Sequence, residues 1–231
     1  MKTNLILFVI GAVCIAAAAV ASTPVAPSAH GSRTIYLVRH GAYEEGARAD
    51  PQLGPGLTPL GVAEARLVAA RLRGLPIQFD EITSSTLLRA RQTAAVIHEL
   101  LTEVPLKQTS QLVECTPPGS DEADGEAGTA QAACAERLNG VFAQEFVPAR
   151  NKDQNDLIVA HGNVIRYLVV KALGADTRTW TAMSVAHASV TIIRVRADGT
   201  MTVIAVGDIG HLPPNMQSWG GGADPQLTAP H

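Results

Sequence analysis

Short apolar runs alternate along the chain with longer segments in which apolar residues recur every three or four positions. The runs at residues 34–38, 79–83 and 157–160 are rich in β-branched and aliphatic side chains, which is typical of buried strands. Helical periodicity follows each run, and the predicted helices cover residues 59–73, 86–101, 138–146 and 164–173. A further strand is expected near residues 106–113, and a hairpin is expected over residues 189–195 and 201–206. This alternation predicts an α/β fold, a three-layer α/β/α sandwich with a mainly parallel sheet.

The two ends of the chain differ in composition from the domain between them. Lys2, the apolar run of residues 5–20 and the small residues up to Ala21 resemble a secretory signal peptide over residues 1–21. We therefore expect export to the periplasm, with a retained membrane anchor as the alternative. The rest of the chain is predicted to contain a linker (residues 22–33), one domain large enough for an enzyme (residues 34–214) and a flexible tail (residues 215–231).

Length and charge narrow the classes of function. The chain has 231 residues, of which 46% are hydrophobic and 17% charged, so one domain can bury a full core. The formal net charge of −3 gives no general attraction for nucleic acid or for anionic lipid. Contact with a membrane is expected only if the N-terminal segment is retained. Cys115 and Cys134 would remain after export, and both a disulfide between them and two free thiols stay open.

Three polar clusters each follow the carboxyl end of a predicted strand. They are Arg39-His40-Gly41, residues 84–89 with Arg89, and His161-Gly162-Asn163. In an open α/β sheet these ends line one edge, where ligands bind. Helix N-termini open at the same edge and favour an anion. Guanidinium and imidazole groups collected there predict a phosphate site.

The residue types in these clusters also indicate the reaction. The sequence has no Walker glycine loop and no His-rich or Asp-rich metal spacing, so we expect neither a cofactor nor a metal. A neutral imidazole can act as the nucleophile and form a phosphohistidine. Arginine side chains would neutralise the charge of the transferred group, and a carboxylic acid would protonate the leaving group.

Four stretches carry a resemblance to a known family. They occur at residues 37–41 (LVRHG), 57–61 (LTPLG), 85–93 (STLLRARQT) and 161–166 (HGNVIR). In this order they resemble the histidine phosphatase (phosphoglycerate mutase-like) superfamily, and the likeness extends over about residues 34–214. Residues 112–114, 163–167 and 207–214 are similar to a mitochondrial branch of Ser/Thr protein phosphatases within it.

The resemblance implies a role for each matching residue. His40 would accept the phosphoryl group, and the phosphate would be held by Arg39, Arg89, His161, Gly41 and Asn163. Glu114 would donate the proton to the leaving group and later activate water. Glu44 or Glu45 could compete for that role, because the loop after Gly41 departs from the family pattern. His187 and His211 are expected to be structural or rim residues.

Two other functions are compatible with these residues. One is a non-catalytic module that binds phosphate without turnover. The other is a mutase-type phosphotransferase, although the Asn-Glu-Arg-His-Tyr-Gly stretch of mutases is absent. The expected partner is a phosphorylated protein or small molecule. The sequence indicates neither its identity nor the oligomeric state.

Overall fold

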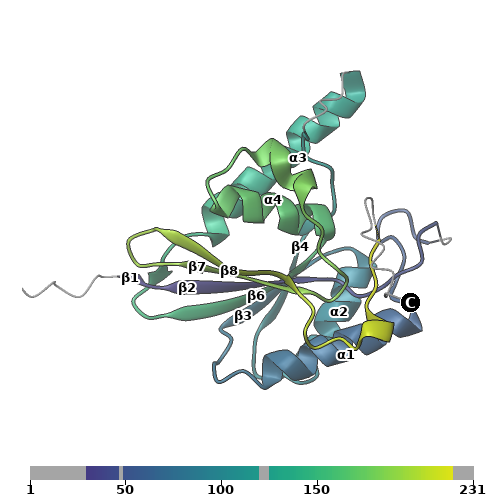
Figure 1. Ribbon diagram of the computed structural model, residues 1–231, viewed down its shortest axis with the longest axis horizontal. Coiled ribbons are helices and arrows are strands. Elements are labelled where there is room, and N and C mark those ends of the chain that lie inside the picture. Colours follow the sequence, from purple (N-terminus) through teal and green to yellow (C-terminus); the bar gives the residue numbers. More distant parts are fainter. Residues whose placement is uncertain (1–29, 47–48, 120–124, 221–231) are drawn as a thin grey trace, which may run out of the picture.

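The computed structural model describes residues 30–46, 49–119 and 125–220. The predicted signal segment, the predicted linker up to residue 29 and the last part of the predicted tail, residues 221–231, lie outside the described residues. Within the described part, a central sheet carries helices on both of its faces (Figure 1).

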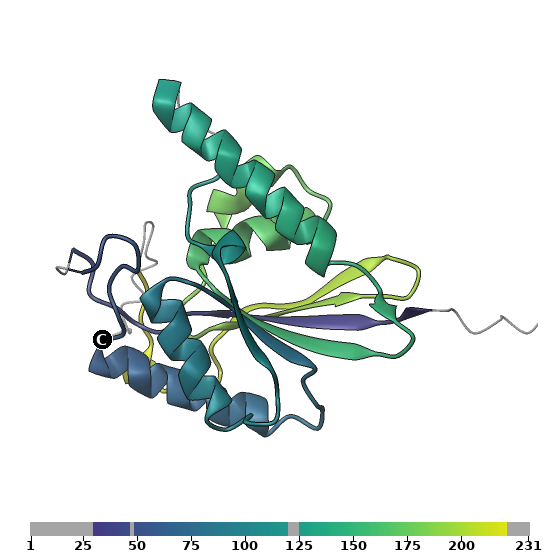
Figure 2. The same ribbon diagram turned by 180° about the vertical axis from the view of Figure 1, so that it is seen from behind.

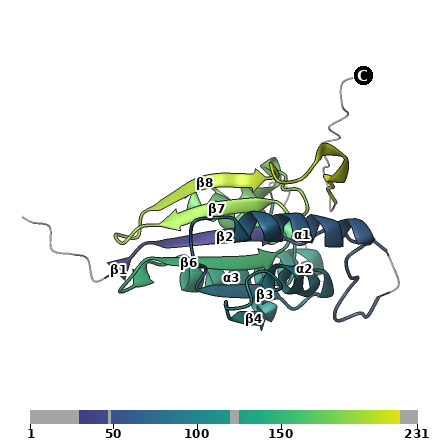
Figure 3. The same cartoon turned by 90° about the horizontal axis from the view of Figure 1, so that it is seen from below.

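The main sheet has six strands in the order β4-β3-β6-β2-β7-β8. Their bounds are Arg33–Arg39 (β2), Glu81–Ser85 (β3), Leu106–Thr109 (β4), Gln154–Ala160 (β6), Val190–Val195 (β7) and Met201–Asp208 (β8). The pairs β3–β4, β3–β6 and β2–β6 are parallel, whereas β7 and β8 form the expected antiparallel hairpin beside β2. Figure 3 shows this order across the sheet. The prediction of a mainly parallel α/β sandwich is therefore confirmed.

Two layers of helices enclose this sheet. α1 (Pro59–Arg73) and α2 (Leu88–His98) cover one face, and α3 (Gly125–Glu145) and α4 (Gly162–Ala172) cover the other (Figures 1 and 2). Short 3₁₀ helices occur at Ser110–Leu112 (η1), Thr177–Ala182 (η2) and Pro214–Met216 (η3). A two-stranded ribbon joins His30–Gly31 (β1) to Ala149–Arg150 (β5).

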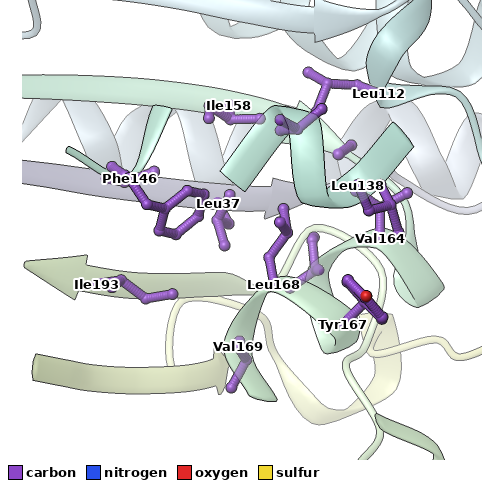
Figure 4. Close-up of a cluster of buried hydrophobic side chains, with 14 of the residues drawn as sticks. Leu37, Leu112, Leu138, Phe146, Ile158, Val164, Tyr167, Leu168, Val169 and Ile193 are labelled. Atoms are coloured by element: carbon purple, nitrogen blue, oxygen red, sulfur yellow. The ribbon is translucent and has the colours of Figure 1, made fainter. Parts of the chain in front are cut away.

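Alternation along the strands divides the core into two clusters. On β2, Ile35 and Leu37 face α3 and α4, while Tyr36 and Val38 face α1 and α2. Successive side chains of a strand point to opposite faces, so a strand buried on both faces is apolar at consecutive positions. This explains the continuous apolar run in the sequence. Figure 4 shows the cluster under α4, where Leu37 lies with Leu168.

Three boundaries differ from the sequence prediction, each for a local reason. The strand expected over residues 106–113 stops at Thr109, whose hydroxyl accepts a hydrogen bond from the Gln111 N–H and starts η1. α3 begins at Gly125, whereas the sequence predicted a helix only from near residue 138. The first turns of α3 are exposed and have no apolar periodicity, so the pattern did not reveal them. His30, Gly31 and Arg33, predicted as linker, pair in strands, and Arg33 is held by Asp156 at 2.8 Å.

The start of α1 is in backbone contact with the loop that follows β2. Thr58 caps the helix by accepting a hydrogen bond from the Gly61 N–H at 3.1 Å, and its own N–H donates to the Ala42 carbonyl at 3.0 Å. A Cβ atom on Gly61 would lie 2.0 Å from that carbonyl oxygen. Only glycine permits this approach, which fixes the loop carrying residues 40–42.

We expect Gly61→Ala to lower the free energy of unfolding by about 1–3 kcal/mol, because the new methyl group overlaps the Ala42 carbonyl. Gly140→Ala is the matched control. It lies inside α3 with nothing within 4 Å of the added Cβ, so it should stabilise the protein by about 0.5–1 kcal/mol. Chemical denaturation followed by circular dichroism measures both values. Equal stabilisation by the two substitutions would contradict the steric constraint.

Candidate active site

Three neighbouring strands bring the predicted polar clusters to one edge of the sheet. In the β2–β6 register Arg39 is opposite Ala160, so the residues that follow, His40 and His161, lie next to each other. The His40 N–H donates to the Ala160 carbonyl at 3.0 Å, and the two imidazole centroids are 5.0 Å apart. β3 ends on the other side of β6, and α2 then presents Arg89.

His40 is held in one tautomer and one orientation. Its side chain is buried, and its Nδ1 lies 2.8 Å from the Gly41 carbonyl oxygen, an acceptor that requires the proton on Nδ1. Nε2 therefore carries the lone pair, and it accepts a hydrogen bond from Arg89 Nε at 3.1 Å. Burial, with the nearby His161 and Arg39, holds the pKa of His40 well below its usual value. The imidazole is neutral and nucleophilic at neutral pH.

Arg39 and Arg89 supply positive charge on two sides of His40. Arg39 Nη1 donates to the Val185 carbonyl at 2.7 Å, and Nη2 donates to the Gly220 carbonyl at 2.5 Å. The Arg89 guanidinium lies over the ring of Tyr43, 4.7 Å from its centroid. Burial lowers the pKa of both guanidinium groups, and the acidic neighbour Glu114 opposes that effect. Both groups are buried cations, which an anion would stabilise.

Several buried polar atoms at this edge lack a hydrogen-bond partner. Six such side-chain atoms occur in the described part of the chain, and four of them are Arg39 Nε, Glu114 Oε1, His161 Nδ1 and His187 Nε2. Native proteins satisfy nearly all buried polar atoms, so a cluster of exceptions is typical of a site that binds a polar ligand. The N-terminus of α4, directly after His161, adds backbone N–H groups that favour an anion. The site can bind a tetrahedral oxyanion.

Glu114 is the carboxylate that faces this cluster. It lines a pocket together with Arg39, Tyr43 and Arg166. Burial raises its pKa above the usual value, although Arg39 and the other arginines act in the opposite direction. Glu45 is exposed and accepts a hydrogen bond from the Tyr43 hydroxyl at 3.1 Å, and the exposed Glu44 lines a separate hollow. The geometry thus favours Glu114 over both alternatives as the acid.

Two residues expected to bind phosphate make protein contacts. The Gly41 N–H donates to Thr93 Oγ1 at 3.1 Å. The Asn163 side chain donates to the Cys115 carbonyl at 3.1 Å and accepts a hydrogen bond from Arg166. Each polar group therefore already has a partner within the fold. These contacts fix the loops around the anion site, and the predicted phosphate contacts of Gly41 and Asn163 stay a prediction.

His187 was expected to be a structural or rim residue, and its ring lies 5.3 Å from that of His40. Ser218 Oγ donates to Glu64 Oε1 at 2.5 Å and lies 2.8 Å from His187 Nδ1. Since the serine proton is used on Glu64, Nδ1 must donate and Nε2 is the lone-pair nitrogen. Burial, followed by the effects of Arg39 and Arg89, lowers the pKa of His187 to about 3. The sequence carries only a weak signal that His187 lies at the site. His187 precedes β7, and the apolar pattern does not specify the direction of β7, so it does not show at which edge of the sheet this residue lies.

In the described part of the chain, no group of three or more His, Cys, Asp and Glu side chains is arranged to hold a metal ion.

His211 lies at the outer side of the site, where its Nε2 is 3.1 Å from the Ala188 carbonyl oxygen and its Nδ1 is 3.1 Å from Arg71. These contacts place His211 among the groups that support the edge of the sheet.

Comparison with known proteins assigns the class. The sequence profile of the Histidine phosphatase superfamily (branch 1) matches residues 35–117 and 115–208. The chain therefore belongs to this superfamily, and it is a phosphatase, an enzyme that acts on phosphorylated substrates.

Curated relatives narrow the comparison to one branch. The chain is 35% identical to the Caenorhabditis elegans protein named Serine/threonine-protein phosphatase Pgam5, mitochondrial, over 81% of this chain and 67% of the relative. Identity to the Xenopus tropicalis protein of that name is 29%, over 79% of this chain and 67% of the relative.

Solved structures confirm the fold. A phosphoglycerate mutase from Bacillus anthracis superposes with a TM-score of 0.60 at 20% identity, covering 80% of this chain and 96% of that structure. A mycobacterial glucosyl-3-phosphoglycerate phosphatase superposes with a TM-score of 0.56 at 23% identity, covering 75% and 97%. At this level of identity the likeness shows the fold alone.

The prediction of a signal peptide and periplasmic export is wrong by the same comparison. The relatives with the higher identities are named as mitochondrial proteins, which gives no support to a periplasmic location. No helix among residues 30–46, 49–119 and 125–220 is long and apolar enough to cross a membrane. The prediction rested on the apolar run of residues 5–20, and such a run is not specific to one export route.

We expect Arg89→Ala to weaken the binding of vanadate, a tetrahedral phosphate analogue, by about 10- to 100-fold. The substitution removes charge-assisted hydrogen bonds of about 1.5–3 kcal/mol. Arg66→Ala is the matched control, because it removes the same charge from an exposed position on α1. Isothermal titration measures both affinities. If both variants bind vanadate as the wild type does, Arg89 does not belong to the anion site.

Proposed function

We propose that this enzyme hydrolyses phosphate monoesters without a metal ion, through a phosphohistidine formed on His40. The supporting observation is the lone-pair Nε2 of His40, which lies among buried cations and buried polar atoms without a partner at the edge of the sheet. Arg39, Arg89 and His161 would hold the phosphate oxygens. An incoming phosphate oxygen would replace the Gly220 carbonyl on Arg39 and draw the Arg89 Nε–H away from His40.

In the first step, His40 Nε2 attacks phosphorus and the bond to the leaving oxygen breaks. The carboxyl group of Glu114 gives its proton to that oxygen, so a neutral alcohol leaves. The pKa of Glu114 is raised by burial, which increases its protonated fraction. Positive charge from Arg39 and Arg89 balances the charge on the phosphoryl oxygens as the P–N bond forms.

In the second step, the Glu114 carboxylate accepts a proton from a water molecule. The water oxygen attacks phosphorus, the P–N bond breaks, and its electron pair returns to His40 Nε2. Inorganic phosphate is released and the neutral imidazole is restored. Since burial and neighbouring cations hold the pKa of His40 well below its usual value, the imidazole leaves this step unprotonated.

We expect His40→Asn to abolish hydrolysis of para-nitrophenyl phosphate in excess EDTA, because asparagine cannot form the covalent intermediate. Rapid acid-free quenching with ³²P-labelled substrate should trap labelled wild-type protein and no labelled variant. His98→Asn is the control. It removes an imidazole at the last residue of α2 and should keep full activity. Hydrolysis by the His40 variant at the wild-type rate would refute the mechanism.

For the substrate, we propose phosphoserine and phosphothreonine in proteins. Two curated relatives, 35% and 34% identical, are named as Ser/Thr protein phosphatases. The alkyl oxygen of serine or threonine needs a proton to leave more than a phenolate oxygen does, and a buried acid with a raised pKa supplies one. The pocket beside Arg39 is also lined by Tyr43, Ser184 and Arg166, which offer polar contacts to a peptide next to the phosphate.

We expect kcat/KM for phosphoserine and phosphothreonine peptides to exceed that for free phosphoserine and 3-phosphoglycerate by at least about tenfold, because the peptide adds contacts of about 1.4 kcal/mol or more. A phosphate-release assay on the four substrates measures the ratios, with a phosphotyrosine peptide of matched sequence as control. A preference for the small esters would reject a protein substrate and leave the role of His40 intact.

A further inference from the structure

The residue proposed as the acid lies in a segment without regular secondary structure. Residues 113–119 connect η1 to the chain that leads to α3, and Glu114 is near the start of this segment. Its neighbour Cys115 forms a disulfide with Cys134, which resolves the alternatives left open by the sequence. Cys134 is buried in α3 within the core cluster under α4. One covalent link thus joins the acid-bearing segment to a packed helix.

Cys115 contacts the acid and the edge of the site directly. Its backbone N–H acts on the Glu114 carboxylate and lowers the pKa of that group, against the larger effect of burial. Its carbonyl accepts a hydrogen bond from Asn163 in the first turn of α4, at 3.1 Å. A shift of the Cys115 backbone would therefore move the Glu114 carboxylate relative to Arg39 and His40. The disulfide holds that backbone in place.

The other anchors of this segment lie on either side of the two residues. Arg137 donates to the carbonyl groups of Ser110, Gln111 and Val113, in contacts that are exposed or half-buried. Trp180 Nε1 donates to the carbonyls of Pro117 and Pro118 at 3.2 and 3.0 Å. Hydrogen bonds in reach of water each contribute little to the free energy. Among the described contacts, the disulfide is the covalent anchor of the Glu114-Cys115 backbone.

We propose that the Cys115–Cys134 disulfide positions Glu114 for proton transfer and makes hydrolysis of alkyl phosphates dependent on the redox state. This inference rests on the proposed function of Glu114 and His40. A dithiol supplies two electrons and two protons: the S–S bond breaks, two thiols form, and the dithiol becomes a disulfide. The half-buried Cys115 gives the reductant access to the bond.

Reduction should affect the two parts of the site differently. His40, Arg39, Arg89 and His161 are held by strands and helices and do not belong to the tethered segment. Oxyanion binding and attack by His40 should therefore persist. Proton donation should weaken, because general acid catalysis depends on close geometry. Alkyl esters need that proton, whereas 2,4-dinitrophenyl phosphate has a leaving group stable enough to depart without it.

The experiment compares the full chain before and after reduction with excess dithiothreitol. We expect kcat for a phosphoserine peptide to fall by about 10- to 100-fold. The vanadate affinity and the rate of the first burst of dinitrophenolate release from 2,4-dinitrophenyl phosphate should each change less than about twofold, because formation of the phosphohistidine from this ester does not need the Glu114 proton. Mass spectrometry of alkylated protein reports the thiol state, and thermal unfolding verifies that the reduced protein is folded at the assay temperature.

Two variants serve as controls. The double variant Cys115→Ser/Cys134→Ser should show the low alkyl-phosphate rate from the start and should not respond to the reductant. Glu114→Gln lacks the acid, so its remaining rate should be the same before and after reduction. A response in Glu114→Gln would mean that the disulfide acts through another group and would overturn the inference.

Two results in the wild type would also overturn it. The first is an unchanged kcat for the phosphoserine peptide in protein shown to be reduced. The second is an equal loss with both substrates together with loss of vanadate binding, which indicates general unfolding. Failure of the proposed function looks different, because then neither the oxidised nor the reduced protein forms a phosphohistidine.

Discussion

The parallel pairing of β2 with β6 determines where the chemistry of this enzyme can occur. Their register sets Arg39 opposite Ala160, and both strands end at these residues. Two imidazole groups from distant parts of the sequence therefore lie side by side with centroids 5.0 Å apart. Because both strands are buried on both faces, a slip of one residue would reverse the side chains of an apolar strand and misplace the histidine. The core and the nucleophile thus depend on one register.

Burial of this edge places neutral imidazole groups beside charged guanidinium groups. Desolvation keeps His40 and His161 neutral, while Arg39 and Arg89 remain as cations beside them. The carbonyl of Gly220 and the Nε2 of His40 accept hydrogen bonds from the two arginines. A phosphate dianion accepts such hydrogen bonds more strongly than these neutral groups do. The arrangement of buried cations therefore favours a phosphorylated substrate.

Much of this site could be predicted from the sequence because each main group directly follows an apolar strand or starts a helix. The positions of His40, Arg89 and His161 needed only the alternation of elements and the rule that ligands bind at strand ends. The protein contacts of Gly41 and Asn163 could not be predicted, because motif spacing does not show whether a polar group already has a partner in the fold.

Other features depend on long-range pairing that no local pattern encodes. The Glu64–Ser218–His187 chain joins α1 to the segment after η3 across 154 residues, so only the folded chain reveals it. The start of α3 was missed because an exposed helix rich in alanine has no apolar stripe to detect.

The placement of the acid on a loop follows from what the two steps require. The nucleophile must stay fixed, and strands and helices hold it. The acid must give a proton to one oxygen and then take one from a water molecule, so its surroundings need to support both charge states. Burial raises the pKa of Glu114 and favours its protonated state, while the arginines Arg39, Arg89 and Arg166 act in the opposite direction and favour its carboxylate. A small displacement would disturb this balance. The segment that carries Glu114 has no ladder of backbone hydrogen bonds to hold it. The disulfide of Cys115, one residue away, therefore provides a covalent anchor for the acid.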